Sequence, residues 1–575
     1  MNIIIGISWP FANGELHIGH AASSLPGDVI SRYHRLKGDK VILVSGTDCH
    51  GTPTEVKALQ ENKSPKEIVD DCHVSFSKDF KDLGISFDLY NRTDNPYHKE
   101  FVQEQFVKYY NNGYLEEKEE EQLYCDHCKL FLADRYIIGI CPKCGAEIKG
   151  DECEKCGSLL TIDEVKETKC AICGNKASYK KNKNLYFKLS IFQDNIKELL
   201  DSKRNDWREN AVNFTERYLK EGIPDRCASR TLNYGIDIPI DGFKDKKLYG
   251  WFENVWGYVT ASKKYAEENK LNWKVFWKGN DSKIYLVHAK DNIPFHTVIF
   301  PSLLLATNDN YRLPDKIVSD EYITIEGEKL SKSKGNYITL RHLLDNYPVD
   351  AIRYYFSINN PETRDFNFTY EGFINSINGE LLGKWGNFVN RTLQFINKSF
   401  YGNLSSSNID STIEAKLKDL YINIGNDIDN GDTKEGLSKI FDFINYSNKY
   451  FDENEPWKLA KEDVIKCEDI LYNCCNIIFN INTAISSKKY FELFGISLLK
   501  MDNDLMEGDI SKNALIITKE VNEENLTNGD IIAYEVHGQI KINKIYNSTD
   551  EGYKTKYNQA YYLDIETINY NQIIG

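Results

Sequence analysis

The pattern of apolar and polar positions predicts an α/β fold for the first part of the chain. Uninterrupted apolar runs at residues 3–7 and 41–44 are typical of buried parallel strands and predict strands over 3–8 and 41–45. Apolar residues three and four positions apart predict helices over 20–37, 65–83 and 96–112. Strands that alternate with helices in this way indicate a parallel sheet covered by helices.

The pattern changes further along the chain. Residues 116–182 are polar and turn-rich with little apolar periodicity, so a core there would need a metal. The α/β pattern resumes with a strand-like run at 283–287 and an apolar helix after His296. Helical spacing runs through 341–500, and short β-like runs follow from about 508. We therefore predict two halves of an α/β domain separated by an insertion, then a helical domain and a β-rich tail, with bounds 1–115, 116–182, 183–340, 341–507 and 508–575.

Composition and charge narrow the class of protein. The chain of 575 residues is long enough for several domains, and its net charge of −15 weighs against a nucleic-acid coat protein but permits a large enzyme. Met1 leads at once into a strand-like run, so no signal peptide is expected, and no apolar stretch reaches the ~18–20 residues that span a bilayer. These features predict a cytoplasmic protein with no membrane association.

Cysteine spacing predicts metal sites in the polar insertion. Eight of the fourteen cysteines form four CxxC pairs, which in a cytoplasmic chain indicate zinc knuckles rather than disulfides. Redox-active pairs are a poor alternative, because four of them in one polar segment would exchange partners. Eight thiolates make two closed tetrahedral sites, which are structural because no coordination position stays open. The eight predicted ligands are Cys125, Cys128, Cys141, Cys144, Cys153, Cys156, Cys170 and Cys173.

A histidine pair follows the first predicted strand, in the sequence His17-Ile18-Gly19-His20. A strand that leads through a glycine-containing loop into a helix N-terminus is an anion site. Gly19 allows a planar base to approach the backbone, and the imidazoles can donate to phosphate oxygens. A motif of only four residues is also compatible with two loop histidines that occur together by chance.

A second candidate motif, Lys329-Leu330-Ser331-Lys332-Ser333, ends the second half of the α/β region. Two lysines around a serine-containing loop suit capture of a pyrophosphate. Taken alone, this stretch equally fits a solvated basic loop.

The two motifs together, in this order and just before a helical domain, resemble the two signatures of class I aminoacyl-tRNA synthetases. Within that class, residues 1–460 resemble the methionyl-tRNA synthetases. The Lys-Asp-Asn-Ile-Pro-Phe-His form at 290–296 looks like the archaeal and eukaryotic branch. The matching stretches are 9–14, 46–53, 290–296 and 350–355.

The resemblance implies a Rossmann-type catalytic domain with a zinc-knuckle insertion, followed by an α-helical anticodon-binding domain. The implied reaction joins methionine to ATP, giving methionyl-adenylate and pyrophosphate, and then transfers methionine to tRNA(Met). His17 and His20 would stabilise the α-phosphate, and Lys329 and Lys332 would hold the pyrophosphate. The implied ATP contacts, with Mg²⁺ bound to the ATP, are Asn13, Gly19, Ser331 and Ser333. The resemblance also implies nested zinc pairing, in which the inner two CxxC pairs share one ion and the outer two share the other.

The resemblance also implies an amino-acid pocket. Asp48 would take the substrate ammonium, although a carboxylate in this position can also cap the following turn. The remaining implied pocket residues are Ser8, Trp9, Phe11, Trp251, Asn254, Tyr258 and His296.

Several pocket positions depart from the family pattern. Phe11 replaces a usual tyrosine and loses a hydroxyl that could bond His296. Asn254, Val255 and Trp256 stand where the family has other residues, and an amide that faces a thioether is unfavourable unless it is bonded elsewhere. These departures predict altered tolerance for methionine analogues.

Three residues of the helical region match the family's anticodon contacts. Asn387 and Arg391 are four apart and hence on one helix face, and Trp457 follows a proline at a helix start. The resemblance assigns them to the CAU anticodon, whose unstacked bases can stack on an aromatic ring. The alternative is a solvated polar pair and a core tryptophan.

Two further functions stay open at this point. One is a paralogue that activates a different or modified amino acid, which the altered pocket favours. The other is a catalytically inactive tRNA-binding protein, against which both intact motifs speak. The tail beyond about 500 does not resemble the basic oligonucleotide-binding domain of some family members, and its pattern fits a hairpin or small barrel for packing or dimerisation. Neither the oligomeric state nor any protein partner follows from the sequence.

Overall fold

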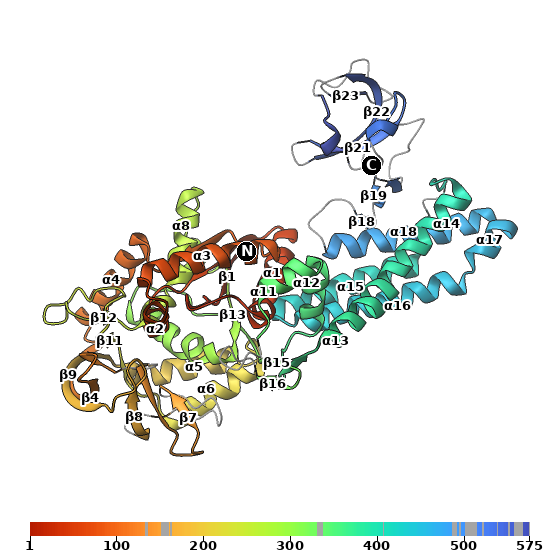
Figure 1. Ribbon diagram of the computed structural model, residues 1–575. Coiled ribbons are helices and arrows are strands. Elements are labelled where there is room, and N and C mark those ends of the chain that lie inside the picture. The colour runs from red at the N-terminus through yellow and green to blue at the C-terminus, as the bar shows by residue number, and fades with distance from the viewer. Residues whose placement is uncertain are drawn as a thin grey trace. The chain divides into compact units, whose positions relative to one another are not determined.

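The computed structural model divides the chain into two compact units, Met1–Thr369 with Ile428–Lys434, and Tyr370–Asp427 with Glu435–Gly575. Each unit is described by itself (Figure 1). The described residues are 1–132, 136–150, 160, 164–329, 337–405, 408–485, 491–493, 496–500, 515–519, 523–536, 539–549, 552–556 and 567–573.

A five-stranded parallel sheet in the order β14-β13-β1-β2-β3 forms the centre of the first unit. The side chains of Ile3, Ile4 and Ile5 on the middle strand are completely buried, which explains why this strand has an uninterrupted apolar sequence. The predicted α/β class is therefore confirmed. The strands are β1 (Asn2–Ile7), β2 (Lys40–Thr47), β3 (Leu89–Arg92), β13 (Ser282–Ala289) and β14 (Lys316–Asp320).

Helices form over 20–37, 65–83 and 96–112 and after His296, as the spacing predicted, and several further helices of this unit were not predicted. The N-terminal helices are α1 (Ile18–Leu36), α2 (Thr52–Glu61), α3 (Pro65–Asp82) and α4 (Pro96–Asn111), and the later ones are α5 (Gln193–Lys203), α6 (Glu209–Glu221), α7 (Gly250–Asn254), α8 (Gly257–Glu268), α9 (Lys274–Trp277) and α10 (Phe300–Ala306). Helix α1 contacts β1, β2 and β13, and also α11 (Leu340–Asn346) and α12 (Val349–Ile358).

A buried ion pair ties α1 to α12. Asp28 of α1 is completely buried and lies 2.6 Å from an Arg353 guanidinium nitrogen and 2.8 Å from Arg32 Nε. Burial raises the pKa of Asp28, but the two guanidinium groups outweigh burial and hold it below its usual value. The charge is therefore fully paired, as a buried carboxylate must be to remain stable.

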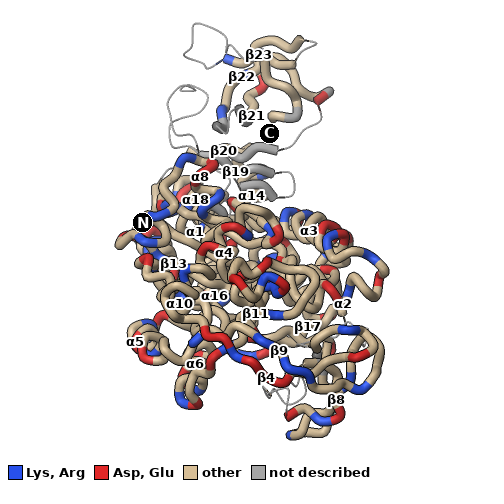
Figure 2. Tube along the Cα trace, turned by 90° about the vertical axis from the view of Figure 1, so that its left-hand side faces the viewer, with Lys and Arg blue, Asp and Glu red and all other residues tan. Residues whose placement is uncertain are grey.

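The polar insertion contains a long antiparallel ribbon that the sequence pattern did not predict, and this ribbon forms the middle of a four-stranded sheet. Strands β4 (Leu115–Cys125) and β9 (Ser178–Phe187) pair antiparallel over ten residues. Acidic positions on β4 lie opposite basic positions on β9, with Lys181 Nζ 3.2 Å from Glu119 and Lys183 Nζ 2.5 Å from Glu117 (Figure 2). Cross-strand charge pairs stabilise the ribbon here, so the chain needs little apolar alternation.

The second unit is mainly helical. Phe388, Val389, Leu393 and Ile396 are buried, as their helical spacing predicted. The described helices end at Ile485 and strands begin at Phe491, so the helical region is shorter than predicted. The helices are α13 (Tyr370–Ser376), α14 (Asn387–Phe400), α15 (Ser411–Asn430), α16 (Thr433–Glu453), α17 (Pro456–Glu462) and α18 (Val464–Ile485).

The C-terminal segment is β-rich, as predicted. Strands β21 (Ile531–Val536), β22 (Gln539–Thr549) and β23 (Gly552–Lys556) form an antiparallel sheet. Its small core contains Ile532, Tyr534, Ile545, Tyr553 and Ile568.

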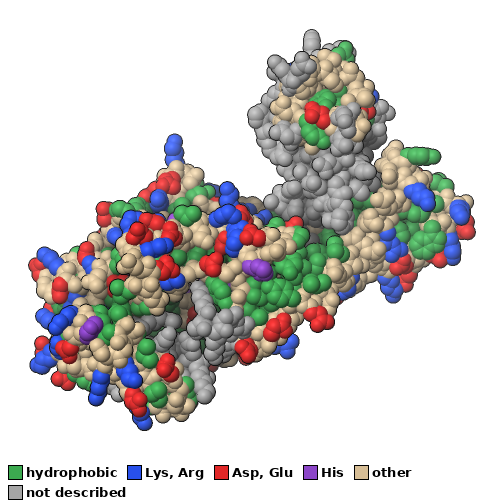
Figure 3. Space-filling model, in the orientation of Figure 1, with side chains coloured by type: hydrophobic (Ala, Val, Ile, Leu, Met, Phe, Trp, Pro, Cys, Tyr) green, Lys and Arg blue, Asp and Glu red, His purple; other side chains and the backbone are tan. Residues whose placement is uncertain are grey.

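Basic and acidic side chains are interspersed over the surface of the first unit that Figure 3 shows. The negative net charge is therefore spread rather than gathered on this face. Among the described helices, none has the length and apolar content needed to span a bilayer.

Candidate active site and metal centre

The two histidines of the loop after β1 are held by reciprocal hydrogen bonds at the start of α1. The backbone N–H of His17 donates to His20 Nδ1 at 3.0 Å, and that of Gly19 donates to His17 Nδ1 at 3.1 Å. The two ring centroids are 3.9 Å apart. Because each Nδ1 accepts a hydrogen, each neutral ring carries its proton on Nε2, which makes that nitrogen a donor. Donors at a helix N-terminus suit a phosphate group.

These histidines open into a pocket of about 240 Å³ at the carboxyl edge of the sheet. Open α/β sheets bind ligands at this edge. The predicted contacts Phe11 and Asn13 share the pocket with both histidines. Its lining residues are Phe11, Asn13, Glu15, His17, His20 and Phe76.

The chain that follows the lysine motif is fastened to this histidine loop. The Ile18 N–H donates to the Ile338 carbonyl at 3.2 Å, and the Leu340 N–H donates to the Leu16 carbonyl at 2.9 Å. The Tyr337 hydroxyl donates to the Glu15 carbonyl at 2.7 Å. The segment that directly follows the lysine motif is thus held against the histidine loop, from the opposite end of the α/β region.

The lysine motif itself is only partly described. Strand β16 (Glu328–Lys329) ends at its first lysine and pairs with β15 (Ile323–Ile325). Ser331, Lys332 and Ser333 lie outside the described residues, so their roles stay predictions.

Asp48 lies beside this loop, at the carboxyl end of β2. The backbone of Asp48 makes two hydrogen bonds to the loop after β1. Its N–H donates to the Pro10 carbonyl, and its carbonyl accepts from the Ala12 N–H, each at 2.9 Å. Its carboxyl group is buried, and Oδ1 accepts a long 3.4 Å bond from the His50 N–H. Oδ2 has no hydrogen-bond partner among the residues that the structure describes. A carboxylate that only capped the turn would accept hydrogen bonds on both oxygens. A substrate ammonium would instead provide the donor that Oδ2 lacks.

Burial and then the charge of Glu253 raise the pKa of Asp48 well above its usual value, and the amide of Asn254 lowers it by less. Asn254 is buried, and its Nδ2 also has no hydrogen-bond partner within the described part of the chain. The Asn254 amide, which the sequence analysis expected to face the thioether of the substrate, therefore lies beside the Asp48 carboxyl group. Val255 and Trp256 are completely buried in the main hydrophobic core.

A buried tyrosine and a buried histidine form a hydrogen-bonded pair that is not part of the lining of that pocket. The Tyr258 hydroxyl donates to His296 Nε2 at 2.8 Å, and His296 Nδ1 donates to the Asn292 carbonyl at 2.8 Å. Burial lowers the pKa of His296 to about 4, so the ring is neutral at physiological pH. Because Tyr258 already bonds His296, the hydroxyl missing from Phe11 leaves no unpaired nitrogen there. His288, whose ring stacks on His296 at 4.2 Å between centroids, was not predicted as a pocket residue.

A row of aromatic rings, here called the aromatic wall, extends from Phe11, which lines the pocket. Trp251 and Phe295 stack with centroids 3.5 Å apart, and Phe11 meets Trp251 edge-on at 5.6 Å. Phe295 was not singled out from the sequence. An aromatic wall of this kind suits an apolar or thioether side chain.

Trp9 and Ser8 form the base of the site. A Cβ atom added to Gly46 or Gly257 would approach the Trp9 ring to 2.2 or 2.7 Å, so both glycines are needed to accommodate this ring. The Ser8 N–H donates to the Val287 carbonyl at 2.9 Å, which continues the pairing of β1 with β13.

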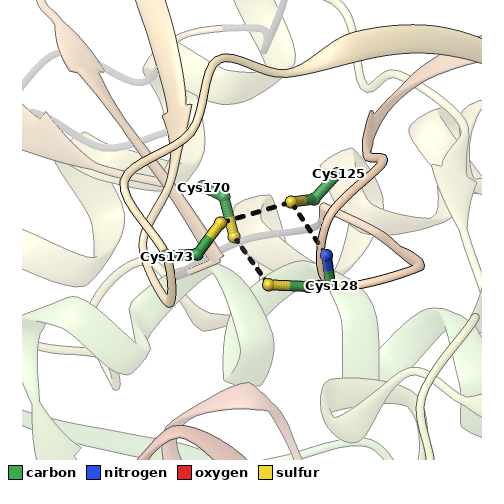
Figure 4. A group of neighbouring side chains, drawn as sticks. All are labelled: Cys125, Cys128, Cys170 and Cys173. Atoms are coloured by element: carbon green, nitrogen blue, oxygen red, sulfur yellow. Dashed lines mark hydrogen bonds between the residues drawn. The ribbon is translucent and has the colours of Figure 1, made fainter.

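Four cysteines in the insertion form a metal-binding group (Figure 4). Their sulfur atoms lie within 4.8 Å of one another. The sulfurs of Cys125 and Cys173 are 3.5 Å apart, and those of Cys128 and Cys170 are 3.9 Å apart. Tetrahedral zinc with Zn–S bonds of about 2.3 Å needs sulfur separations of about 3.8 Å. The group therefore fits a closed structural zinc site.

This group unites the outer two CxxC pairs, as the resemblance implied. Of the inner pairs, Cys141 and Cys144 are described, while Cys153 and Cys156 lie outside the described residues. The second zinc site stays a prediction.

Removal of one ligand tests the metal assignment. Cys173→Ser should lower the zinc content by about one ion per chain, because three thiolates hold structural zinc less tightly than four. The variant should lose order in the insertion while the parallel sheet persists. Zinc analysis and hydrogen exchange measure the two effects, with Cys227→Ser as the matched control. Unchanged zinc content in Cys173→Ser would remove the cluster from metal binding.

The candidate anticodon contacts lie in the second unit. Arg391 of α14 lies over the Phe451 ring, 4.2 Å from its centroid, and forms an ion pair with Asp452. The Trp457 ring lies 6.3 Å from Phe451, and 41% of this tryptophan is exposed. Trp457 is thus no core tryptophan. Asn387 begins α14 and is exposed; Phe451 and Asp452 were not predicted.

Comparison with known proteins identifies the family. The family described as tRNA synthetases class I (M) matches residues 3–393. The chain is 44% identical to methionine–tRNA ligase 1 of Alkaliphilus oremlandii (strain OhILAs), over 92% of this chain and 99% of that protein. It is 45% identical to a methionine–tRNA ligase of Bacillus cereus (strain B4264), over 84% and 88%. The chain therefore belongs to the methionine–tRNA ligase family of class I aminoacyl-tRNA synthetases.

A solved structure shares the fold. Methionyl-tRNA synthetase of Mycobacterium tuberculosis in complex with methionyl-adenylate aligns with a TM-score of 0.70 and 22% identity, over 84% of this chain and 91% of that one. The family resemblance from the two motifs is thus confirmed. The similarity to the Alkaliphilus protein covers 92% of the chain and so continues past residue 500 into the C-terminal segment, further than expected. The archaeal and eukaryotic likeness of residues 290–296 stays a prediction.

Proposed function

We propose that this chain activates methionine with ATP to methionyl-adenylate and transfers it to tRNA(Met), recognised by its CAU anticodon. One observation carries the proposal: the histidine loop, the flank of the lysine motif and the unpaired Asp48 oxygen all lie at the carboxyl edge of one sheet. Relatives with 44–45% identity are named methionine–tRNA ligases, which supports the same reaction.

In the first step, a carboxylate oxygen of methionine attacks the α-phosphorus of ATP, and pyrophosphate leaves with the bridging oxygen. The step needs positioning and charge neutralisation rather than covalent help. His17 and His20 donate from Nε2 to the α-phosphate as negative charge builds on it. Lys329 and Lys332 neutralise the pyrophosphate, and Mg²⁺ enters with ATP. Further ATP contacts come from Asn13, Gly19, Ser331 and Ser333.

The amino acid is held by its ammonium and its side chain. Asp48 Oδ2 accepts the ammonium, which all standard α-amino acids other than proline carry, so this contact anchors rather than selects. Selection comes from the aromatic wall of Phe11 and Trp251 and from the neutral Tyr258–His296 pair. Ser8, Trp9 and Asn254 complete the pocket.

In the second step, a hydroxyl of the terminal adenosine of tRNA attacks the adenylate carbonyl, and AMP leaves. Asn387, Arg391 and Trp457 read the anticodon in the second unit. The closed cysteine site leaves no coordination position open, so zinc stabilises the insertion and takes no part in the chemistry. A thiol-rich metal site needs a reducing compartment, and we therefore place the enzyme in the cytoplasm.

Replacement of the exposed tryptophan tests the tRNA assignment. Trp457→Ala should lower kcat/KM for tRNA(Met) about tenfold to a hundredfold, because one base stack contributes ~1–3 kcal/mol. Exchange of ATP and pyrophosphate without tRNA should stay unchanged. Aminoacylation of a tRNA transcript measures the effect, with Tyr421→Ala as a control at an aromatic of similar exposure. If wild-type enzyme charges transcripts with and without CAU equally well, the anticodon assignment is wrong.

A further inference from the structure

A buried hydrogen-bonded cluster lies behind the amino-acid site and has no part in the steps above. His50 Nδ1 is 2.8 Å from Glu253 Oε1, and His98 Nε2 is 3.0 Å from Glu253 Oε2. His98 Nδ1 is in turn 2.8 Å from the Thr260 hydroxyl. Each of these four side chains is at most 2% exposed. Both carboxylate oxygens of Glu253 are therefore bonded, and solvent does not reach them.

The cluster joins four elements around the Asp48 loop. His50 comes two residues after Asp48, and its N–H is the group that bonds Asp48 Oδ1. His98 lies in the first turn of α4, Glu253 in α7 and Thr260 in α8. Glu253 is thus the point at which the loop is fixed to the helices behind it.

Glu253 also acts on the site through its neighbour in the sequence. Asn254 carries the unpaired amide beside Asp48. Burial raises the pKa of Glu253, but His50 and His98 outweigh burial through their charges and hydrogen bonds and hold it below its usual value. Glu253 is therefore an ionised group, locked between two imidazoles, beside the anchoring carboxylate.

We propose that Glu253 is a positioning residue for the amino acid: through its bonds to His50 and His98 it fixes the Asp48 loop in the geometry that receives the substrate ammonium, and it holds the Asn254 amide beside that loop. This inference rests on the proposed function. A positioning role differs from a purely structural role in what a substitution changes. Loss of positioning weakens amino-acid binding much more than ATP binding, whereas loss of a structural ion pair affects both.

Glu253→Gln tests the inference, because the amide keeps the shape of the side chain and removes its charge. Loss of that charge would by itself lower the pKa of Asp48 and favour its ionised form, so a rise in KM for methionine would report lost positioning. In methionine-dependent ATP–pyrophosphate exchange, KM for methionine should rise about tenfold or more, as for loss of a buried charged hydrogen bond. KM for ATP and kcat should stay within about twofold of wild type. Glu268→Gln, an exposed carboxylate on α8, should change none of these quantities.

Thr260→Val provides a second variant that keeps side-chain volume and removes the outer bond to His98, together with a long 3.3 Å bond from the Thr260 hydroxyl to the Gly257 carbonyl within α8. It should raise KM for methionine by a smaller factor, again with KM for ATP unchanged. Equal rises in both KM values, or an unchanged methionine KM in folded Glu253→Gln, would overturn the positioning role. Failure of the wild-type enzyme to activate methionine would instead contradict the proposed function, so the two failures are distinguishable.

Discussion

His20→Ala should slow methionine-dependent ATP–pyrophosphate exchange by about a hundredfold to a thousandfold, the usual effect of removing one transition-state donor. The substitution removes the Nε2 donor from the α-phosphate and the Nδ1 acceptor from the His17 N–H. KM for methionine should change little, because Asp48 and the aromatic wall are untouched.

A glutamine at the same position provides the control. His20→Gln keeps an N–H donor of similar reach and should recover part of the lost rate. Thermal unfolding of both variants should match wild type within a few degrees. An exchange rate in His20→Ala within about threefold of wild type would exclude the histidine loop from catalysis.

Asp48→Asn should raise KM for methionine about a hundredfold, because the substrate ammonium would face an uncharged amide in a buried site. The shape of the side chain is kept, so KM for ATP should stay close to the wild-type value. Exchange kinetics with each substrate varied in turn measure the difference.

The same residue predicts a pH dependence. Burial raises the pKa of Asp48, and only its ionised form takes an ammonium. Wild-type kcat/KM for methionine should therefore fall as the pH is lowered through this raised pKa, and Asp48→Asn should abolish that fall. If kcat/KM for methionine falls at low pH in the same way in wild type and in Asp48→Asn, the titrating group is not Asp48.

Much of the central sheet could be predicted from the sequence. Strands β1, β2 and β13 are buried on both faces, so their apolar runs are uninterrupted and easily recognised. The cysteine spacing predicted metal ligands in the insertion. That the first and last CxxC pairs share one site followed only from the family resemblance. The histidine and lysine motifs were predicted to share a site, and hydrogen bonds hold the Ile338–Leu340 segment, which follows the lysine motif, against the histidine loop.

Other features depend on contacts that no local pattern contains. The ribbon of β4 and β9 is stabilised by charge pairs across strands more than fifty residues apart in sequence, so its strands lack apolar alternation. The partners of Glu253 come from His50 and His98, and spacing along the chain gives no sign of that contact. The Asn254 side chain lies beside Asp48, and the sequence pattern likewise contains no sign of this contact.

The most direct test of the proposed function is ATP–pyrophosphate exchange by the wild-type enzyme with each standard amino acid in turn. Hydrophobic pockets separate near-isosteres by only ~1–3 kcal/mol, so the comparison needs kcat/KM values rather than a single rate. We predict that methionine gives the highest kcat/KM of the set. A tenfold higher value for another amino acid, or exchange with none of them, would contradict the account.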